Sequence, residues 1–379
     1  MKPMFRKLIL AAAVAAIVPL VGAPASRAAD TIKMGVVGPH SGDLAPYGIP
    51  SLQAAKLVVK DINAKGGILG KKVELFVEDD QCKPEIATNT ATKLVSDGVN
   101  VVLGPICSGA TKPVLGIYKS ANVVVMSPSA TNPDLTQSGK NPNFFRTISS
   151  DDKQGKLAAD FAINVLHLKK VAILNDKGDY GQGFAEFVQK SIEQDGKGKT
   201  QVVLYDSITP GAFDYSAVIQ KVIRSGADGL IYGGYHPEAS KLVQQLRRKR
   251  SKIPFISDDG VKGDSFIKLA GKYAEGVYAT GPMDLSKNPL YVKAVKEYEA
   301  AYGDKPGNFY PQAYSAALAL LNAIQKAGST NYDAIIKALH TDYVDTPVGH
   351  IRFDKRGDAE GVGFSVYQVQ HGKYVEIQK

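Results

Sequence analysis

Segments with the pattern of buried strands alternate with segments of helical periodicity, and this alternation is the feature that most restricts the fold of the chain. In the first part we expect strands at 32–37 and 72–77 and further strands starting near Val99 and Val123. The intervening helices are predicted around Leu52 to Ile62, at 84–96 and at 108–120. Such alternation predicts a parallel sheet with helices on both faces.

The alternation starts again after Ser150 and then changes near Thr280. Strands are predicted at 171–174, 201–205, 229–232 and 253–256, with helices at 183–194, 215–224 and 237–250 between them. Helices at 289–301, 309–327 and 332–339 follow, and short strand-like pieces at 350–353 and 364–369 close the chain. We therefore expect two discontinuous α/β lobes, with the chain crossing between them more than once.

The first residues have the pattern of a secretory signal peptide. Lys2, Arg6 and Lys7 precede an apolar run at 8–21, and Ser-Arg-Ala at 26–28 offers small residues at the cleavage positions. We expect residues 1–28 to be removed on export. The rest of the 379-residue chain is too long for one typical core and has no apolar run of the ~20 residues that a membrane span needs.

The net charge does not indicate nucleic-acid binding. Removing the four basic residues of the signal peptide lowers the formal net charge from +9 to about +5. The most basic run, 247–252, follows a helical segment and suits the negative end of a helix dipole. We therefore do not expect nucleic acid as a partner.

The chain has two cysteines, Cys82 and Cys107. An even number in an exported protein favours one disulfide, which would tie the loop after a predicted strand to the loop that carries Ser108. Two free buried thiols are the alternative.

Two hydroxyl-bearing loops follow adjacent predicted strands. Ser108 stands at the expected N-cap of a helix, and Thr131 belongs to a Ser-Pro-Ser-Ala-Thr loop after the strand near Val123. Free N–H groups at a helix start favour an anion, and the carboxyl edge of a parallel sheet is where ligands bind. A small carboxylate or phosphate is the predicted ligand group. The alternative is that both residues only cap helices.

The sequence has no recognisable catalytic or metal-binding motif. It contains no His-Glu-x-x-His and no Cys/His cluster, and Ile106 and Ala110 occupy the positions where a nucleophile elbow needs glycine. We expect no enzymatic activity, no metal and no cofactor.

Further aromatic and acidic residues follow strands in both halves. Tyr47 follows the first strand, and Tyr180, Tyr235 and Asp259 follow strands of the second lobe. Each alone fits a packed tyrosine or a helix cap. Together they predict a cleft with hydroxyls on one wall and with aromatic rings and a carboxylate on the other.

Several motifs together resemble those of the periplasmic Leu/Ile/Val-binding proteins, the solute-binding components of ABC importers for branched-chain amino acids. They are Asp-Ile-Asn-Ala-Lys-Gly-Gly-Ile at 61–68, the cysteine pair, Tyr-Gly-Gly-Tyr-His-Pro-Glu at 232–238 and Phe-Asp-Lys-Arg-Gly-Asp at 353–358. The resemblance implies a periplasmic type I binding protein: two Rossmann-like α/β lobes joined by a three-crossover hinge. The implied boundaries are 29–149 plus 283–361 for lobe 1 and 150–282 plus 362–379 for lobe 2.

The resemblance also implies a set of ligand-binding residues. Ser108 and Thr131, with backbone N–H groups from Ser129 and Ala130, would hold an α-carboxylate, and Asp259 would meet an α-ammonium. The side-chain pocket would be lined by Tyr47, Ile106, Tyr180, Tyr235 and Phe309. The sequence departs from the best-known members at two positions, since Asp259 replaces Glu and Ser129 replaces Ala.

The predicted function is the capture of a branched-chain amino acid by a monomer that delivers it to a membrane ABC permease. A binding protein of the same fold for another amino acid, an amide or a small aromatic or organic acid is the closest alternative. A periplasmic hydrolase and a sensor ectodomain are the alternatives from other classes, and the missing nucleophile–base set and the missing membrane span argue against them.

Overall fold

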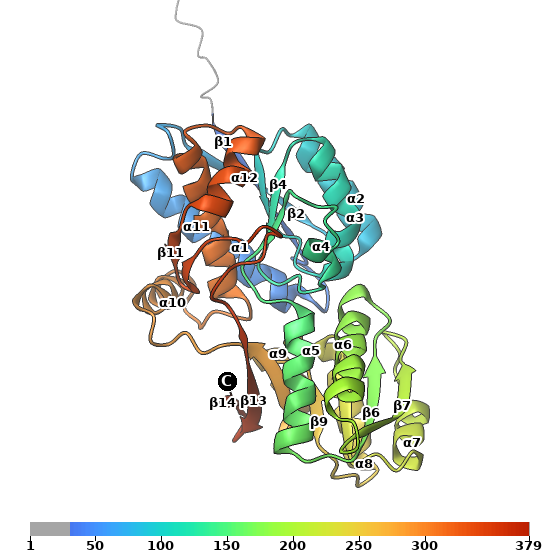
Figure 1. Ribbon diagram of the computed structural model, residues 1–379. Coiled ribbons are helices and arrows are strands. Elements are labelled where there is room, and N and C mark those ends of the chain that lie inside the picture. Colours follow the sequence, from blue (N-terminus) through green and yellow to red (C-terminus); the bar gives the residue numbers. More distant parts are fainter. Residues whose placement is uncertain (1–30, 379) are drawn as a thin grey trace, which may run out of the picture. The chain divides into compact units, whose positions relative to one another are not determined.

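The computed structural model describes residues 31–378, so the predicted signal peptide lies outside the described residues. The described chain forms two α/β lobes (Figure 1). The sheet of the first lobe has five parallel strands in the order β2-β1-β3-β4-β5. They are β1 (Ile32–Gly38), β2 (Val73–Asp79), β3 (Val101–Leu103), β4 (Val124–Ser127) and β5 (Phe144–Arg146).

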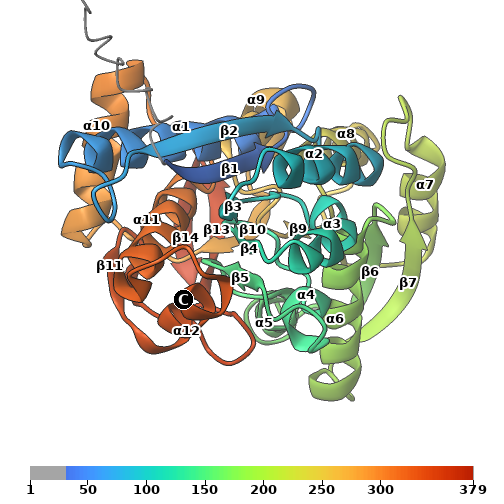
Figure 2. The same cartoon turned by 90° about the horizontal axis from the view of Figure 1, so that it is seen from above.

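Successive residues of these strands face opposite layers of helices, as the two-residue period of a strand requires. Met34 and Val36 pack with α1, α11 and α12, whereas Val37 packs on the other face with α2 and α3 (Figure 2). The helices around this sheet are α1 (Ala45–Ala64), α2 (Pro84–Ser96), α3 (Ser108–Ser120), α4 (Asp134–Gln137), α10 (Pro289–Tyr302), α11 (Tyr310–Ala327) and α12 (Tyr332–Thr341). A two-stranded hairpin of β11 (Val344–Thr346) and β12 (Gly349–Ile351) follows α12.

The sheet of the second lobe has seven strands in the order β14-β13-β10-β9-β8-β6-β7. They are β6 (Lys170–Asn175), β7 (Gln201–Ser207), β8 (Gly229–Gly233), β9 (Phe255–Ser257), β10 (Tyr278–Pro282), β13 (Phe364–Gln370) and β14 (Lys373–Gln378). The helical segments of this lobe are α5 (Asp151–Asp160), which continues as a π-helical turn (Phe161–Val165), α6 (Asp179–Asp195), α7 (Ser216–Arg224), α8 (His236–Arg248) and α9 (Asp264–Ala270), which a 3-10 turn (Gly271–Ala274) follows.

The chain passes between the lobes three times: after β5, after β10 and after β12. The helices that follow β10 belong to the core of the first lobe, since Tyr310 and Leu320 share one hydrophobic cluster with strand residues such as Met34. The chain then returns to the second lobe as β13. The predicted fold, two α/β lobes with a three-crossover hinge, is confirmed.

The structure also corrects the expected elements at several points. Strand β5, helix α5 and strand β14 were not predicted, and the second sheet is not wholly parallel, because β13 runs antiparallel to both β10 and β14. Ser108 is the first residue of α3 rather than its N-cap, a position that Cys107 occupies.

The predicted disulfide between Cys82 and Cys107 is present, with the two Cα atoms 5.5 Å apart. It joins the loop after β2 to the residue that precedes α3, and so fixes the start of that helix. Among residues 31–378, every helix is too short or too polar to cross a membrane.

Candidate functional site

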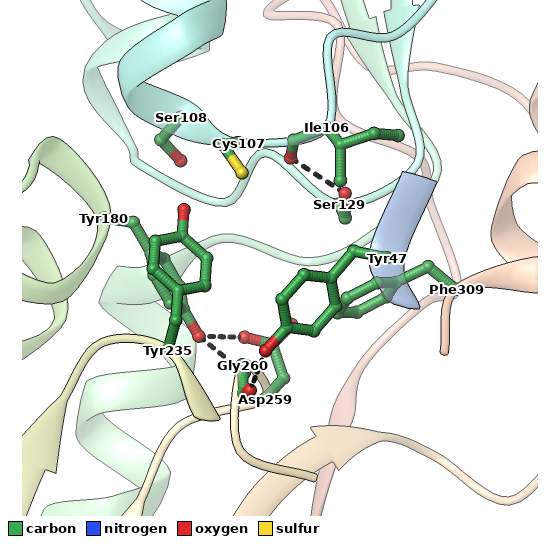
Figure 3. A pocket seen from close by; sticks show the side chains of 10 residues that line it. All are labelled: Tyr47, Ile106, Cys107, Ser108, Ser129, Tyr180, Tyr235, Asp259, Gly260 and Phe309. Atoms are coloured by element: carbon green, nitrogen blue, oxygen red, sulfur yellow. Dashed lines mark hydrogen bonds between the residues drawn. The ribbon is translucent and has the colours of Figure 1, made fainter. Parts of the chain in front are cut away.

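A cavity lies between the carboxyl ends of strands from both lobes (Figure 3). The first turns of α1 and α3 and the loops after β3 and β4 supply its wall on the first lobe, together with the residue that precedes α11. The first turn of α6 and the loops after β8 and β9 supply the opposite wall. The lining residues are Tyr47, Ile106, Cys107, Ser108, Ser129, Tyr180, Tyr235, Asp259, Gly260 and Phe309. All the predicted ligand residues except Ala130 and Thr131 therefore line one cavity.

The first-lobe wall carries hydrogen-bond donors that the protein itself leaves unused. The oxygen of the buried Ser108 hydroxyl accepts a hydrogen bond from the Asn132 N–H at 3.2 Å, which leaves the hydroxyl hydrogen free to be donated. In the described part of the chain, the N–H groups of Ser108 and Gly109 at the start of α3 have no acceptor. These are the unpaired groups of a helix N-terminus, which favour an anion.

Thr131 lies in the loop after β4 and does not line the cavity surface itself, but its polar groups are buried beside it. Its carbonyl accepts a hydrogen bond from the Asp151 N–H at 3.0 Å. Its hydroxyl oxygen is completely buried and has no hydrogen-bond partner within residues 31–378, and the same holds for its N–H. Buried polar groups rarely stay unpaired in proteins, so this loop is suited to a polar ligand.

The Ser129 hydroxyl, which the sequence comparison suggested would lie near a ligand carboxylate, bonds the protein backbone instead. Its Oγ donates a hydrogen bond to the Ile106 carbonyl at 2.8 Å. The hydroxyl hydrogen therefore ties the loop after β4 to the loop after β3 and is not free for a ligand. The Ser127 hydroxyl reinforces this link, since it donates to the Pro105 carbonyl at 2.6 Å and accepts from the Ala130 N–H at 2.9 Å.

The second-lobe wall is acidic. Asp259 is buried, with a side chain that is about 2% exposed. The Tyr180 hydroxyl donates a hydrogen bond to Asp259 Oδ1 and accepts one from the Gly260 N–H at 2.8 Å (Figure 3). The other carboxyl oxygen, Oδ2, is buried with no partner in the described chain. Burial raises the pKa of Asp259 to about 6, although the Tyr180 hydrogen bond opposes the shift.

A second buried carboxyl, Asp151, was missed by sequence reasoning. It is the first residue of α5, is fully buried, and neither of its oxygens has a hydrogen-bond partner among the described residues. Burial raises the pKa of Asp151 well above its usual value, and the charge of Asp259 raises it further; Thr131 and Arg146 act in the opposite direction. The Ser-Ser-Asp-Asp sequence at 149–152 was its signal, but that stretch was interpreted only as the start of the second lobe.

Aromatic rings form the rest of the cavity. Tyr47 lies 5.8 Å from Tyr235 and 6.0 Å from Phe309, measured between ring centroids, and Tyr180 lies 5.2 Å from Tyr235. With Ile106, these residues provide the apolar lining of the cavity. Such a wall is suited to an aliphatic or aromatic group.

Tyr47, Lys112 and Asn132 of the first lobe contact the second lobe around the cavity. The Tyr47 hydroxyl of the first lobe donates to the Gly260 carbonyl and lies 2.5 Å from His236 Nδ1. The Lys112 ammonium is 2.7 Å from the Asp179 carboxylate, and the Asn132 side-chain amide donates to the Asp179 carbonyl at 2.5 Å. The structure is thus a closed arrangement in which the cavity is covered from both sides.

The cavity offers no metal site, because no group of three or more His, Cys, Asp or Glu side chains within residues 31–378 could hold an ion. Its chemistry is that of a binding site with donors on one wall, unpaired carboxyl oxygens on the other and an apolar remainder.

Comparison with known proteins agrees with this architecture. The family model described as periplasmic binding protein matches residues 31–373. The Leucine-, isoleucine-, valine-, threonine-, and alanine-binding protein of Pseudomonas aeruginosa is 35% identical over 90% of this chain and 91% of its own length. A leucine binding protein from Thermotoga maritima superimposes with a TM-score of 0.85 at 26% identity, covering 92% of this chain and 98% of that chain. A branched-chain amino acid transporter substrate binding protein from Streptococcus pneumoniae, in complex with isoleucine, gives a TM-score of 0.81 at 28% identity, covering 92% of this chain and all of that one. The chain belongs to the periplasmic binding protein family.

Proposed function

We propose that the protein binds a zwitterionic amino acid with an aliphatic side chain in this cavity and delivers it to a membrane ABC permease. The observation that carries the proposal is the opposition of two sets of unpaired groups. Ser108, the Thr131 N–H and the start of α3 offer hydrogen-bond donors, while Asp259 offers a buried carboxyl oxygen that no group within residues 31–378 bonds. An α-carboxylate satisfies the first set and an α-ammonium satisfies the second.

The names of the relatives support the aliphatic part of this proposal. They bind leucine, isoleucine, valine, threonine and alanine in one case, and isoleucine in another. The rings around Tyr47 would cover such a side chain, and burying it contributes roughly 2 to 3 kcal/mol. We assign the ligand contacts to Ser108, Thr131 and Asp259, and the side-chain pocket to Tyr47, Ile106, Tyr180, Tyr235 and Phe309. The Ser129 hydroxyl and the N–H groups of Ser129 and Ala130 are bonded within the protein and hold the loop in shape.

We further propose that residues 29–149 with 283–361 move as one lobe and residues 150–282 with 362–379 as the other. The packing of Tyr310 and Leu320 in the core of the first sheet supports this division. We propose that the mature protein is a periplasmic monomer without enzymatic activity, and that the predicted signal peptide directs its export.

Calorimetric titration of refolded, ligand-free protein tests the function. Leucine, isoleucine, valine, alanine and phenylalanine are compared with 4-methylpentanoate, which lacks the ammonium, and with 3-methylbutylamine, which lacks the carboxylate. We expect at least one aliphatic amino acid to bind with micromolar or better affinity, which requires about 8 kcal/mol, and both truncated analogues to bind at least a hundredfold more weakly. Binding of the simple acid as tightly as the amino acid would contradict the proposal, and so would the absence of binding by every amino acid.

A further inference from the structure

We propose that Arg146 is a positioning residue for the ligand carboxylate and that it acts through the peptide group between Ala130 and Thr131. The inference rests on the proposed function, because it concerns an anionic group held at Thr131. Arg146 is the last residue of β5 and is completely buried. It does not line the cavity, so its role has to pass through other groups.

The guanidinium of Arg146 donates hydrogen bonds to the loop after β4 on both sides of Thr131. Its Nη1 donates to the Ala130 carbonyl at 3.2 Å and to the Asn132 carbonyl at 3.0 Å, and its Nη2 donates to the Thr136 hydroxyl at 2.7 Å. A planar guanidinium with several fixed donors holds its acceptors in one geometry, which a flexible ammonium cannot do. The orientation of Thr131 is therefore set by Arg146.

The same contacts allow the positive charge of Arg146 to polarise the peptide group that faces the site. The Ala130 carbonyl and the Thr131 N–H are the two ends of one peptide group, so a cation that binds the oxygen polarises the N–H and makes it a stronger donor. Hydrogen bonds in such a chain strengthen one another, by about 10–30% for each bond. The Thr131 N–H has no acceptor among the described residues. A polarised N–H forms its strongest hydrogen bond with an anionic acceptor.

The charge of Arg146 is balanced by a residue far away in the sequence. Its Nε donates to Asp358 Oδ1 at 2.5 Å, and only 14% of the Asp358 side chain is exposed. Asp358 belongs to the Phe-Asp-Lys-Arg-Gly-Asp motif at 353–358, which joins the edge of β5: the Arg146 N–H donates to the Gly357 carbonyl at 3.0 Å, and the Ala359 N–H donates to the Arg146 carbonyl at 3.1 Å. The motif at 353–358 thus supplies the counter-ion of Arg146, and the chain continues from it directly into the third crossover.

The close approach of the 353–358 backbone to β5 requires glycine at position 357. Its φ of +98° lies in a region that favours glycine, and a Cβ atom there would lie 2.1 Å from the Phe144 carbonyl oxygen. The backbone can therefore come close enough to β5 for Asp358 to reach Arg146 only when position 357 is glycine.

The test is a comparison of leucine with leucinamide, which keeps the ammonium and the side chain but has no negative charge on its carboxyl end. The main variant is Arg146→Gln with Asp358→Asn, which removes both buried charges together and leaves neither unpaired. The control is Arg352→Gln with Glu360→Gln, which removes a comparable pair, with Nε–Oε2 at 2.9 Å, from the same returning segment at a site that is about 40% exposed and does not touch the loop. Affinities are measured by calorimetry on each ligand-free protein.

We expect the wild type to prefer leucine strongly and the main variant to narrow the leucine-to-leucinamide affinity ratio at least tenfold, with the control within threefold of the wild type. A purely structural role for Arg146 would weaken both ligands equally, and an unchanged ratio in a folded variant would overturn the inference. If the main variant does not fold, Arg146→Lys provides the test, because it keeps the charge but loses the planar guanidinium. The leucine-to-leucinamide affinity ratio should then narrow by about three- to tenfold. An unchanged ratio again overturns the inference. A wild type that binds neither ligand would instead contradict the proposed function.

Discussion

The hydroxyl of Tyr180 donates a hydrogen bond to Oδ1 of Asp259, and the other carboxyl oxygen faces no partner within residues 31–378. One half of the carboxyl group is thus held in place by the protein, while the other half is available to the proposed ligand. The aspartate side chain is one methylene shorter than that of glutamate, so its carboxyl extends less far into the cavity. The Tyr180 hydroxyl, itself bonded by the Gly260 N–H, holds the carboxyl at this position.

Replacing Asp259 by Asn should abolish most of the preference for amino acids. The substitution keeps the shape but leaves the buried ammonium without its anion, and truncating one partner of such a pair costs about 2 to 5 kcal/mol. Leucine affinity should fall by tens- to thousands-fold, whereas 4-methylpentanoate should bind no more weakly than before. Calorimetric titration of both proteins with both compounds checks this, with Asp195→Asn on the exposed side of α6 as the control. An undiminished preference for leucine would remove Asp259 from the site.

The ligand-free protein should lose stability as the pH rises from about 4 to 6, partly because of Asp259. Its pKa is near 6 in the folded protein and close to 4 in the unfolded chain, so the folded state binds the extra proton in this window and unfolding becomes easier as that proton is lost. The difference corresponds to about 3 kcal/mol. Asp259→Asn should therefore be more stable than the wild type at pH 7, and this advantage should shrink toward pH 4.

Urea unfolding of the two ligand-free proteins at pH 4 and pH 7 measures this effect. Comparing the variant with the wild type at each pH removes the contributions of buried carboxyls that Asp259 does not influence, such as Asp80 and Asp176, whose pKa values also rise to about 6. The charge of Asp259 also raises the pKa of Asp151, and this coupling changes the difference in the same direction. A stability difference that does not change with pH would show that Asp259 is not the group that titrates.

Breaking the disulfide between Cys82 and Cys107 should destabilise the protein by about 3 kcal/mol, because the bond closes a loop across 25 positions of the sequence and restricts the unfolded chain. Alkylation of the native, unreduced protein should modify neither thiol, as read by mass spectrometry. The paired substitution Cys82→Ser with Cys107→Ser should lower the unfolding midpoint and also weaken leucine binding, since Cys107 precedes α3 and lines the cavity. Full alkylation of both cysteines in freshly isolated protein would contradict the bond.

The lobe contact made by Tyr47 should matter more for closure than the one made by Lys112. The Tyr47 hydroxyl is buried against Gly260 and His236, and each such hydrogen bond contributes about 0.5–1.5 kcal/mol, whereas Lys112 and Asp179 are partly exposed and screened. Tyr47→Phe should weaken leucine binding by roughly three- to thirtyfold. Lys112→Ala should change it by less than about fivefold.

Small-angle scattering gives the matching structural readout. The wild type should show a smaller radius of gyration with saturating leucine than without it, and Tyr47→Phe should need more leucine to reach the same value. An identical profile with and without leucine would count against a closing cleft.

The sequence predicts elements best where periodicity is strong. Helices α2 and α3 have the expected bounds, because apolar residues recur at helical spacing between clear start and stop signals. Strand β5 has only three residues after a turn, too few to show a period, and β14 lies at the edge of its sheet, so both escaped prediction.

Site residues follow the same logic. Residues such as Tyr47 and Tyr235 were found because they follow recognisable strands, and the cavity brings them together. Asp151 was missed because it begins a helix after the first crossover, and only the packing of that helix within the second lobe brings it near Asp259. Likewise, no local pattern indicates that the Ser129 hydroxyl is used by the Ile106 carbonyl.

The three crossovers also restrict the order in which the chain can fold. The core of the first lobe includes α11 and α12, which end at Ala327 and Thr341, and the second sheet needs β13 and β14, which are the last strands of the chain. Neither lobe can be completed while its C-terminal portion is still being synthesised. Both lobes therefore acquire their final cores only when these late segments of residues 31–378 are available, and until then the exposed faces of both sheets are open to misassociation.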